Sequence, residues 1–301
     1  MMSKQQRETI DQMLRQGSLD LGGEVDEQRP LFAAMLSAVP LPGDVRTEEA
    51  ALGDVPAVTI TVDGTTPRGT ILYFHGGAYA LGSAALSAGL ASELARRSGT
   101  RAVSVEFALA PEHPYPAGLD DAVAAYQALL DDGIPANDIV FAGESSGGGL
   151  ALAAALTIIA TGRPRPAAIY VASPWVDLTT SGASMTTKAD ADPSVTPAGL
   201  RRRARDYAVH HDLADGRISP VFADLTGFPP LLIQVGGNEI LLDDATRLAT
   251  RAAADGVPVT LEVTPGVPHV FVGFNGMLDE ADAALTKAGQ FIRTGLDSVH
   301  D

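Results

Sequence analysis

Short apolar runs of strand length alternate with longer helix-like stretches along most of the chain, and this alternation constrains the fold more than any other feature. The apolar runs lie at 57–62, 70–74, 102–107, 139–142, 168–172, 231–235 and 257–263. The helix-like stretches lie at 84–97, 119–130, 146–160, 243–254 and 278–299. Strands separated by helices favour a mostly parallel sheet that is covered on both faces. The sequence therefore predicts an α/β fold, and 301 residues suffice for one large domain with a small accessory part.

Two segments interrupt the alternation. Residues 1–45 precede the first strand-like run and look helical, and residues 184–212 separate two strand-like runs. Ligands of open α/β sheets bind at the carboxyl ends of the strands, and long insertions there are often functional. We expect the two segments to pack together as a cap over that edge. A solvated helix face is expected for the basic residues of the second segment, Arg201, Arg202, Arg203 and Arg205.

Composition narrows the classes of function. The chain has no cysteine, which excludes disulfides, thiolate metal sites and a cysteine nucleophile. Its net charge of −16 repels nucleic-acid phosphates and anionic lipid, so neither nucleic acid nor a membrane is an expected partner. The longest apolar stretch, 150–160, is shorter than the roughly 18 residues of a membrane span. The polar N-terminal stretch lacks the apolar region of a secretory signal, so we expect a cytoplasmic protein.

A candidate nucleophile lies between a strand-like run and a helix-like stretch rich in alanine and leucine. Residues 143–147 read Gly-Glu-Ser-Ser-Gly, a G-x-S-x-G pattern, and the strand–turn–helix context is the one that a nucleophile elbow requires. We expect Ser145 to be the nucleophile. Ser146 is the alternative, although it fits better as a backbone N–H donor. Glu144 is expected to point away from Ser145 and to make structural hydrogen bonds.

A glycine-rich loop follows the strand-like run 70–74. It reads His75-Gly76-Gly77-Ala78. Acyl transfer builds negative charge on the carbonyl oxygen, and fixed N–H groups close to that oxygen stabilise it. We expect an oxyanion hole in which Gly77, Ala78 and Ser146 donate while Gly76 shapes the loop. His75 is expected to hold this loop rather than to act as a base.

A serine nucleophile needs a histidine base, which in this kind of fold follows the serine and the acid along the chain. The six histidines are His75, His113, His210, His211, His269 and His300. His269 follows the last strand-like run in a turn rich in glycine and proline, where a loop-borne base would lie. We therefore predict that His269 is the base and that His113, which precedes Ser145, is structural.

These motifs together resemble the hormone-sensitive-lipase-like esterases, the bacterial family IV of the α/β-hydrolase superfamily. The likeness rests on an H-G-G-[GA]-aromatic loop followed by G-[DE]-S-[AS]-G-G, and it extends to residues 107–117 and to Ser173-Pro174-Trp175. Ala78 and Ser146 replace a commoner glycine and alanine, but both keep the backbone N–H. The resemblance implies an α/β-hydrolase fold with about eight mostly parallel strands flanked by helices. The similarity runs from about Thr70 to the last helix and is weakest over the first 45 residues. The interrupted alternation gives the expected division into N-terminal cap helices in 1–45 and a catalytic domain in 46–301 with a cap insertion at about 184–212.

The resemblance also suggests the acid. The family often has D-P-L-x-D after the strand that precedes the acid, and its first aspartate falls on Glu239 while Asp243 matches the second. Asp243 and Asp244 are the alternative acids, with helix capping as their other expected role.

These residues predict a serine carboxylesterase that acts on short-chain acyl esters through a Ser-His-Glu triad and an acyl-enzyme, without metal or cofactor. A lactonase or amidase with the same triad is the alternative, as is a non-catalytic binding protein on the same fold. Tyr79, Trp175 and Tyr207 are expected to line the substrate pocket or the core. The resemblance further suggests a homodimer formed through the strand near 257–263.

Overall fold

A computed structural model describes residues 2–297, which form a central sheet of eight strands in the order β1-β2-β4-β3-β5-β6-β7-β8. The strands are β1 (Val45–Leu52), β2 (Val55–Val62), β3 (Thr70–Phe74), β4 (Arg101–Val105), β5 (Ile139–Glu144), β6 (Ala168–Ala172), β7 (Leu231–Gly236) and β8 (Val259–Thr264). The strands from β3 to β8 run parallel, whereas β2 is antiparallel to both of its neighbours. The predicted fold class is confirmed.

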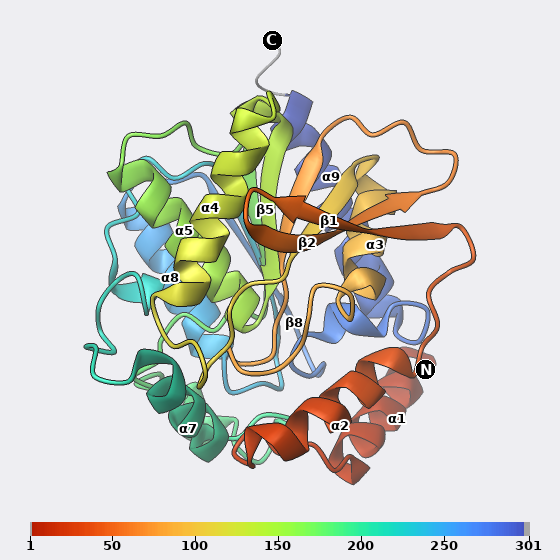
Figure 1. Ribbon diagram of the computed structural model, residues 1–301. Coiled ribbons are helices and arrows are strands. Elements are labelled where there is room, and N and C mark those ends of the chain that lie inside the picture. The colour runs from red at the N-terminus through yellow and green to blue at the C-terminus, as the bar shows by residue number, and fades with distance from the viewer. Residues whose placement is uncertain (1, 298–301) are drawn as a thin grey trace.

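Helices cover both faces of the sheet (Figure 1). One face carries α4 (Ala117–Asp131), α5 (Ser146–Ala160) and α8 (Leu242–Ala254), and the other carries α3 (Ala88–Ser98) and α9 (Asp279–Asp297). The helix α5 is apolar around most of its circumference, since it is buried between the sheet and α4. None of the helices in residues 2–297 is long and apolar enough to cross a bilayer.

The first strand, β1, was not predicted. It pairs with β2 through a two-residue turn at Gly53-Asp54, and Gly53 adopts a φ of 61°. The residues in the middle of β1 are mostly exposed, because the strand lies at the edge of the sheet. An edge strand without a buried face shows no apolar run in the sequence.

Four further α-helices of the described chain lie outside the two layers. They are α1 (Met2–Gln16), α2 (Val25–Ser37), α6 (Ser184–Thr187) and α7 (Pro197–Ala208). Figure 1 shows α1, α2 and α7 among them at the end of the sheet where the parallel strands finish. Arg7 of α1 donates a hydrogen bond of 3.1 Å to the carbonyl of Pro265, just beyond the end of β8.

Arginines of α7 join the two predicted cap segments. Arg202 donates to the carbonyl of Gly22 at 2.6 Å, and Arg203 donates to that of Gly23 at 2.7 Å. Arg203 is only 1% exposed. The prediction of a solvated arginine face was therefore wrong for Arg203, whose guanidinium group is buried against the turn between α1 and α2, whereas Arg202 stays partly exposed.

Candidate active site

Ser145 occupies a sharp turn between β5 and α5. Its backbone adopts φ 53° and ψ −123°, and its N–H donates to the carbonyl of Ala172 at 3.0 Å. A Cβ at Gly147 would lie 2.0 Å from the carbonyl oxygen of Phe74, and one at Gly143 would lie 2.5 Å from that of Gly147. Only glycine fits at these two positions, which is the small-residue requirement that the G-x-S-x-G pattern indicated.

The loops after β7 and β8 bring Glu239 and His269 to Ser145. The Nε2 atom of His269 lies 3.0 Å from the Oγ of Ser145, and its Nδ1 lies 2.7 Å from the Oε2 of Glu239. Glu239 is fully buried, and the His269 side chain is 10% exposed. A continuous hydrogen-bonded row of hydroxyl, imidazole and carboxylate thus connects three loops.

Ser173 is a residue whose role in the site sequence reasoning missed. Its hydroxyl donates to the Oε1 of Glu239 at 2.7 Å and accepts from the N–H of Val270 at 3.0 Å. The N–H of Gly236 also donates to Oε1, at 2.6 Å. Ser173 therefore holds the carboxylate and the loop of the base together. The available signal was the Ser-Pro-Trp sequence after a strand, which we noted only as part of a family likeness.

Charge favours the protonated form of His269. Burial disfavours a charged ring, but nearby carboxylates, chiefly Glu239 through its charge and its hydrogen bond, together raise the pKa of His269 above its ordinary value. The charges of Asp192 and Glu144 raise this pKa further. An imidazolium is thus stabilised here once a proton arrives from the serine.

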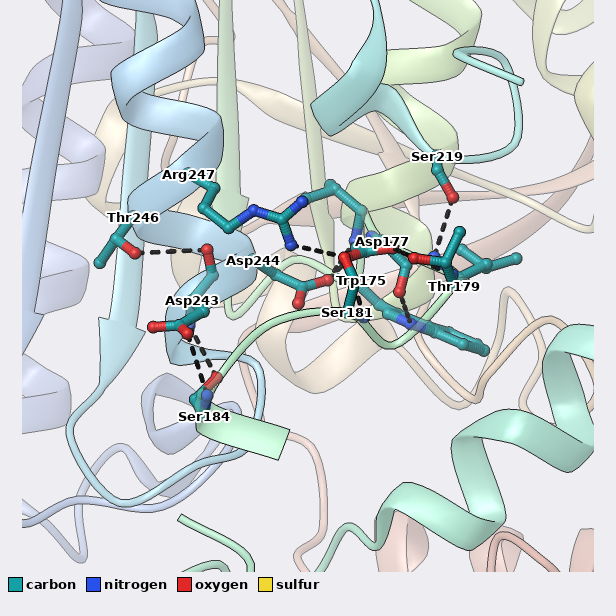
Figure 2. Close-up of polar contacts among 12 residues, drawn as sticks. Trp175, Asp177, Thr179, Ser181, Ser184, Ser219, Asp243, Asp244, Thr246 and Arg247 are labelled. Carbon is teal, nitrogen blue, oxygen red and sulfur yellow. Dashed lines mark hydrogen bonds and ion pairs between the residues drawn. The ribbon is translucent and has the colours of Figure 1, made fainter. Parts of the chain in front are cut away.

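The two alternative acids have other partners (Figure 2). The Oδ2 of Asp243 accepts from the N–H of Ser184 at 2.9 Å, and the Oδ2 of Asp244 accepts from the N–H groups of Val176 and Asp177, each at 2.9 Å. Within the part of the chain that the structure describes, neither carboxylate is hydrogen-bonded to His269. Burial raises the pKa of Asp244 well above its usual range.

The loop after β3 runs beside the serine turn, because β3 and β5 are neighbours with Phe74 paired to Gly143. Gly77 adopts a φ of 117°, where a Cβ would lie 2.2 Å from the carbonyl oxygen of Leu81. Within residues 2–297, the N–H groups of Gly77, Ala78 and Ser146 make no hydrogen bond with the protein. They are therefore available as donors.

Gly76 differs from these donors, because its N–H donates to the Oε1 of Glu144 at 2.7 Å. Because this N–H is already bound, Gly76 shapes the loop of the predicted oxyanion hole and does not serve as one of its donors. The hydroxyl of Ser146 accepts from the N–H of Tyr79 at 3.2 Å. This contact ties Ser146 to the loop and directs its oxygen away from the base.

Two buried ionisable groups stabilise the same loop. The Nδ1 of His75 donates to the carbonyl of Gly76 at 2.8 Å, and its ring stacks on Phe107 at 4.3 Å between centroids. Burial lowers the pKa of His75 to about 4, so its ring is neutral at pH 7. Glu144 also accepts from the hydroxyl of Tyr73, and burial raises the pKa of Glu144 to about 7. Both residues make the structural contacts that we expected.

Three aromatic side chains pack against the start of α5. Tyr79 stacks on Tyr207 at 3.9 Å between ring centroids, and it lies 5.8 Å from Trp175. All three are almost completely buried. The N–H of Trp175 donates to the carbonyl of Ser145 at 2.9 Å, which places this aromatic group beside the serine turn.

The other histidines lie apart from this row. His113, His210 and His211 are exposed, and His211 packs edge-on against Tyr115 at 4.9 Å. His300 lies outside the described residues.

The chain is similar to known proteins over nearly its whole length. A family model described as the alpha/beta hydrolase fold matches residues 71–273. The chain is 39% identical over 298 residues to an acetyl-hydrolase of Streptomyces hygroscopicus, covering 97% of this chain and 98% of that protein. It is 34% identical over 270 residues to an esterase of Acinetobacter venetianus, covering 89% and 88%. A crystal structure of an esterase from the bacterial hormone-sensitive lipase family matches with a TM-score of 0.94 at 39% identity, covering 98% of this chain and 100% of that one.

Proposed function

Because this chain belongs to the α/β hydrolases, in the branch of the bacterial hormone-sensitive-lipase esterases, we propose that it cleaves short-chain carboxylic esters with Ser145 as nucleophile. Of the relatives named above, one is an acetyl-hydrolase and two are esterases. The observation that carries the residue assignment is the hydrogen-bonded row from Ser145 through His269 to Glu239.

The mechanism follows from the position of each group. His269 removes the proton from the Ser145 hydroxyl through Nε2, and the resulting oxygen nucleophile attacks the ester carbonyl. The N–H groups of Gly77, Ala78 and Ser146 stabilise the negative oxygen that forms. His269 then protonates the departing alcohol, which leaves the acyl group on Ser145. A water molecule activated by the same base releases the acid.

Glu239 acts through His269. Its carboxylate fixes which ring nitrogen carries the proton and stabilises the imidazolium in both halves of the reaction. The buried setting strengthens this interaction, since little water screens it. Glu239, rather than Asp243 or Asp244, is thus our choice for the acid.

The preference for short acyl chains is supported by the aromatic side chains at the serine turn. The rings of Tyr79, Trp175 and Tyr207 are almost completely buried and packed against one another, so a long acyl chain placed beside them would have to displace them. We assign residues 1–45 and about 184–212 to a cap over this space. Cytoplasmic location and dimer formation stay predictions from the sequence.

The direct test is hydrolysis of p-nitrophenyl esters from acetate to palmitate, with p-nitroacetanilide and a γ-lactone as further substrates. We expect turnover of acetate to hexanoate, and a loss of about six orders of magnitude in kcat for Ser145→Ala. The palmitate arm is informative because α2 exposes apolar side chains, namely Leu31, Met35 and Leu36. Faster cleavage of palmitate, anilide or lactone than of acetate would contradict the substrate class.

The same assay tests the acid with matched amides. Glu239→Gln should lower kcat by about three orders of magnitude, whereas Asp243→Asn should keep kcat within about tenfold of wild type. The reverse ranking would transfer the role to Asp243.

A further inference from the structure

The predicted cap insertion holds the residue that follows Glu239. The Oδ2 of Asp192 accepts from the N–H of Ile240 at 2.9 Å, and the hydroxyl of Ser184 donates to the carbonyl of Ile240 at 2.5 Å. Both backbone polar groups of Ile240 are thus bound by the insertion. Since Ile240 is joined directly to Glu239, these two bonds fix the main chain that carries the carboxylate.

Ser184 is itself firmly placed (Figure 2). Its N–H donates to the Oδ2 of Asp243 at 2.9 Å, and its hydroxyl accepts from the N–H of Asp243 at 3.0 Å. This reciprocal pair anchors the insertion to the first turn of α8. Asp243 therefore has a structural role in the segment that follows Glu239.

Asp192 is buried and accepts hydrogen bonds with both oxygens. It is 6% exposed, and its Oδ1 accepts from the N–H groups of Ser194 at 3.0 Å and Val195 at 2.9 Å. No ion pair involves this carboxylate within the described part of the chain. Its negative charge is therefore balanced only by N–H and O–H dipoles, and it can act on other buried groups nearby.

One such group is His269. The acidic groups that act on its ring are Glu239 on the loop after β7, Asp192 on the insertion and Glu144 at the end of β5. Burial works against the charged ring, while these three carboxylates favour it. Asp192 is the only one of them that belongs to the insertion.

We propose that Asp192 is a positioning residue for hydrolysis, which holds Glu239 in place through Ile240 and places negative charge near His269 from the cap side. This inference rests on the proposed function, because it assumes that His269 is the base and Glu239 its acid. Within that mechanism, the insertion contributes to catalysis as well as covering the site.

Three variants separate anchoring from charge. Asp192→Asn removes the charge and one strong acceptor, Ser184→Ala removes the other anchor of Ile240 without changing charge, and Asp190→Asn removes a charge from an exposed residue of the same loop. Each would be compared with wild type by kcat and KM on p-nitrophenyl acetate across pH. The rate of Ser145 labelling by a fluorophosphonate across pH gives a second readout that needs no ester turnover.

We expect Asp192→Asn to lower kcat about tenfold with little change in KM, and to shift the acidic limb of kcat/KM to lower pH by roughly half a unit. Ser184→Ala should lower kcat without shifting the limb, and Asp190→Asn should do neither. The direction follows because loss of a negative charge near His269 makes its protonated form less stable.

An Asp192→Asn variant that matches Asp190→Asn in both kcat and limb position would overturn the proposal. If circular dichroism shows that Asp192→Asn does not fold, the Ser184→Ala variant becomes the test of the anchoring of Ile240. A kcat of Ser184→Ala equal to that of wild type would then overturn the proposal that this anchoring supports hydrolysis. Wild-type protein that is labelled but cleaves no ester would instead refute the proposed function, while the labelling profiles would still test Asp192.

Discussion

Ser145 is held in a backbone conformation with positive φ that residues other than glycine rarely adopt. Such a conformation costs free energy and persists only where surrounding contacts impose it. Here the hydrogen bond from the Ser145 N–H to the carbonyl of Ala172 imposes the conformation. The tight turn is possible because Gly143 and Gly147 have no Cβ that would clash with nearby carbonyls. The turn places the hydroxyl in front of His269 before any substrate arrives.

Replacing Gly147 tests this turn. In Gly147→Ala the new Cβ would overlap the carbonyl oxygens of Phe74 and His75, at 2.0 and 2.5 Å. Both are backbone atoms that cannot rotate away, so we expect the free energy of unfolding to fall by roughly 3 kcal/mol or more. Urea unfolding measures this change. The control is Gly43→Ala, where a Cβ meets nothing within 4 Å and stability should stay within about 0.5 kcal/mol.

The raised pKa of His269 predicts the acidic side of the pH profile. His269 must be neutral to accept the proton of Ser145, so activity is lost as pH falls through the pKa of its ring. Because that pKa lies above the ordinary value of 6.5, the midpoint of the acidic limb of kcat/KM should also lie above 6.5. Initial rates from pH 4.5 to 9 give the midpoint. A midpoint clearly below 6.5 would show that burial of the ring outweighs the carboxylates.

Among single residues, Ser145 and His269 were predicted from residue type and chain order, whereas Glu239 was predicted from the family resemblance. Ser145, His269 and Glu239 meet in the structure because each ends or follows a parallel strand, and the carboxyl ends of such strands converge. Ser173 and Asp192 were not predicted. Each acts through a side-chain contact with a segment more than 45 residues away, and no local pattern encodes such a contact.

Among the elements, α7 contributes a side chain to the group of aromatic residues beside the serine turn. Tyr207 stacks on Tyr79, whose backbone N–H is bound to Ser146. Replacing Tyr207 with alanine should open space there, so we expect kcat/KM for octanoate relative to acetate to rise roughly tenfold. Stability should fall by about 3 kcal/mol, since a buried ring is removed.

The matched control is Tyr207→Phe, which keeps the ring and removes a hydroxyl. Its chain-length preference should equal that of wild type. An unchanged preference in Tyr207→Ala would place the acyl chain elsewhere.

The elements that the sequence did not predict have identifiable causes. The strand β1 lies at an edge and has few buried positions, yet the Gly53-Asp54 pair between Leu52 and Val55 is a hairpin signal that could have revealed it. The arginines of α7 could not be placed by composition. A basic run on a helix is usually solvated, and only the approach of the Gly22-Gly23 turn supplies carbonyls for Arg202 and Arg203.

For the whole molecule, the net charge of −16 sets a long-range repulsion that opposes the folded state. Salt screens this repulsion. It also weakens exposed ion pairs, but each such pair contributes little to the free energy of unfolding, so little stability is lost. We therefore expect the melting temperature at pH 8 to rise by a few degrees between 20 and 300 mM NaCl. Near pH 4.6, the isoelectric point, the rise should vanish. A melting temperature that falls with salt at pH 8 would show that local ion pairs dominate.

The most direct test of the mechanism is to locate the covalent intermediate. Brief reaction with p-nitrophenyl butyrate and acid quenching, or reaction with a fluorophosphonate, followed by tandem mass spectrometry, identifies the modified side chain. The hydrogen-bonded row predicts one adduct, on Ser145, and its absence in Ser145→Ala and strong slowing in His269→Ala. An adduct on Ser146, or ester cleavage by Ser145→Ala at the wild-type rate, would contradict Ser145 as the nucleophile.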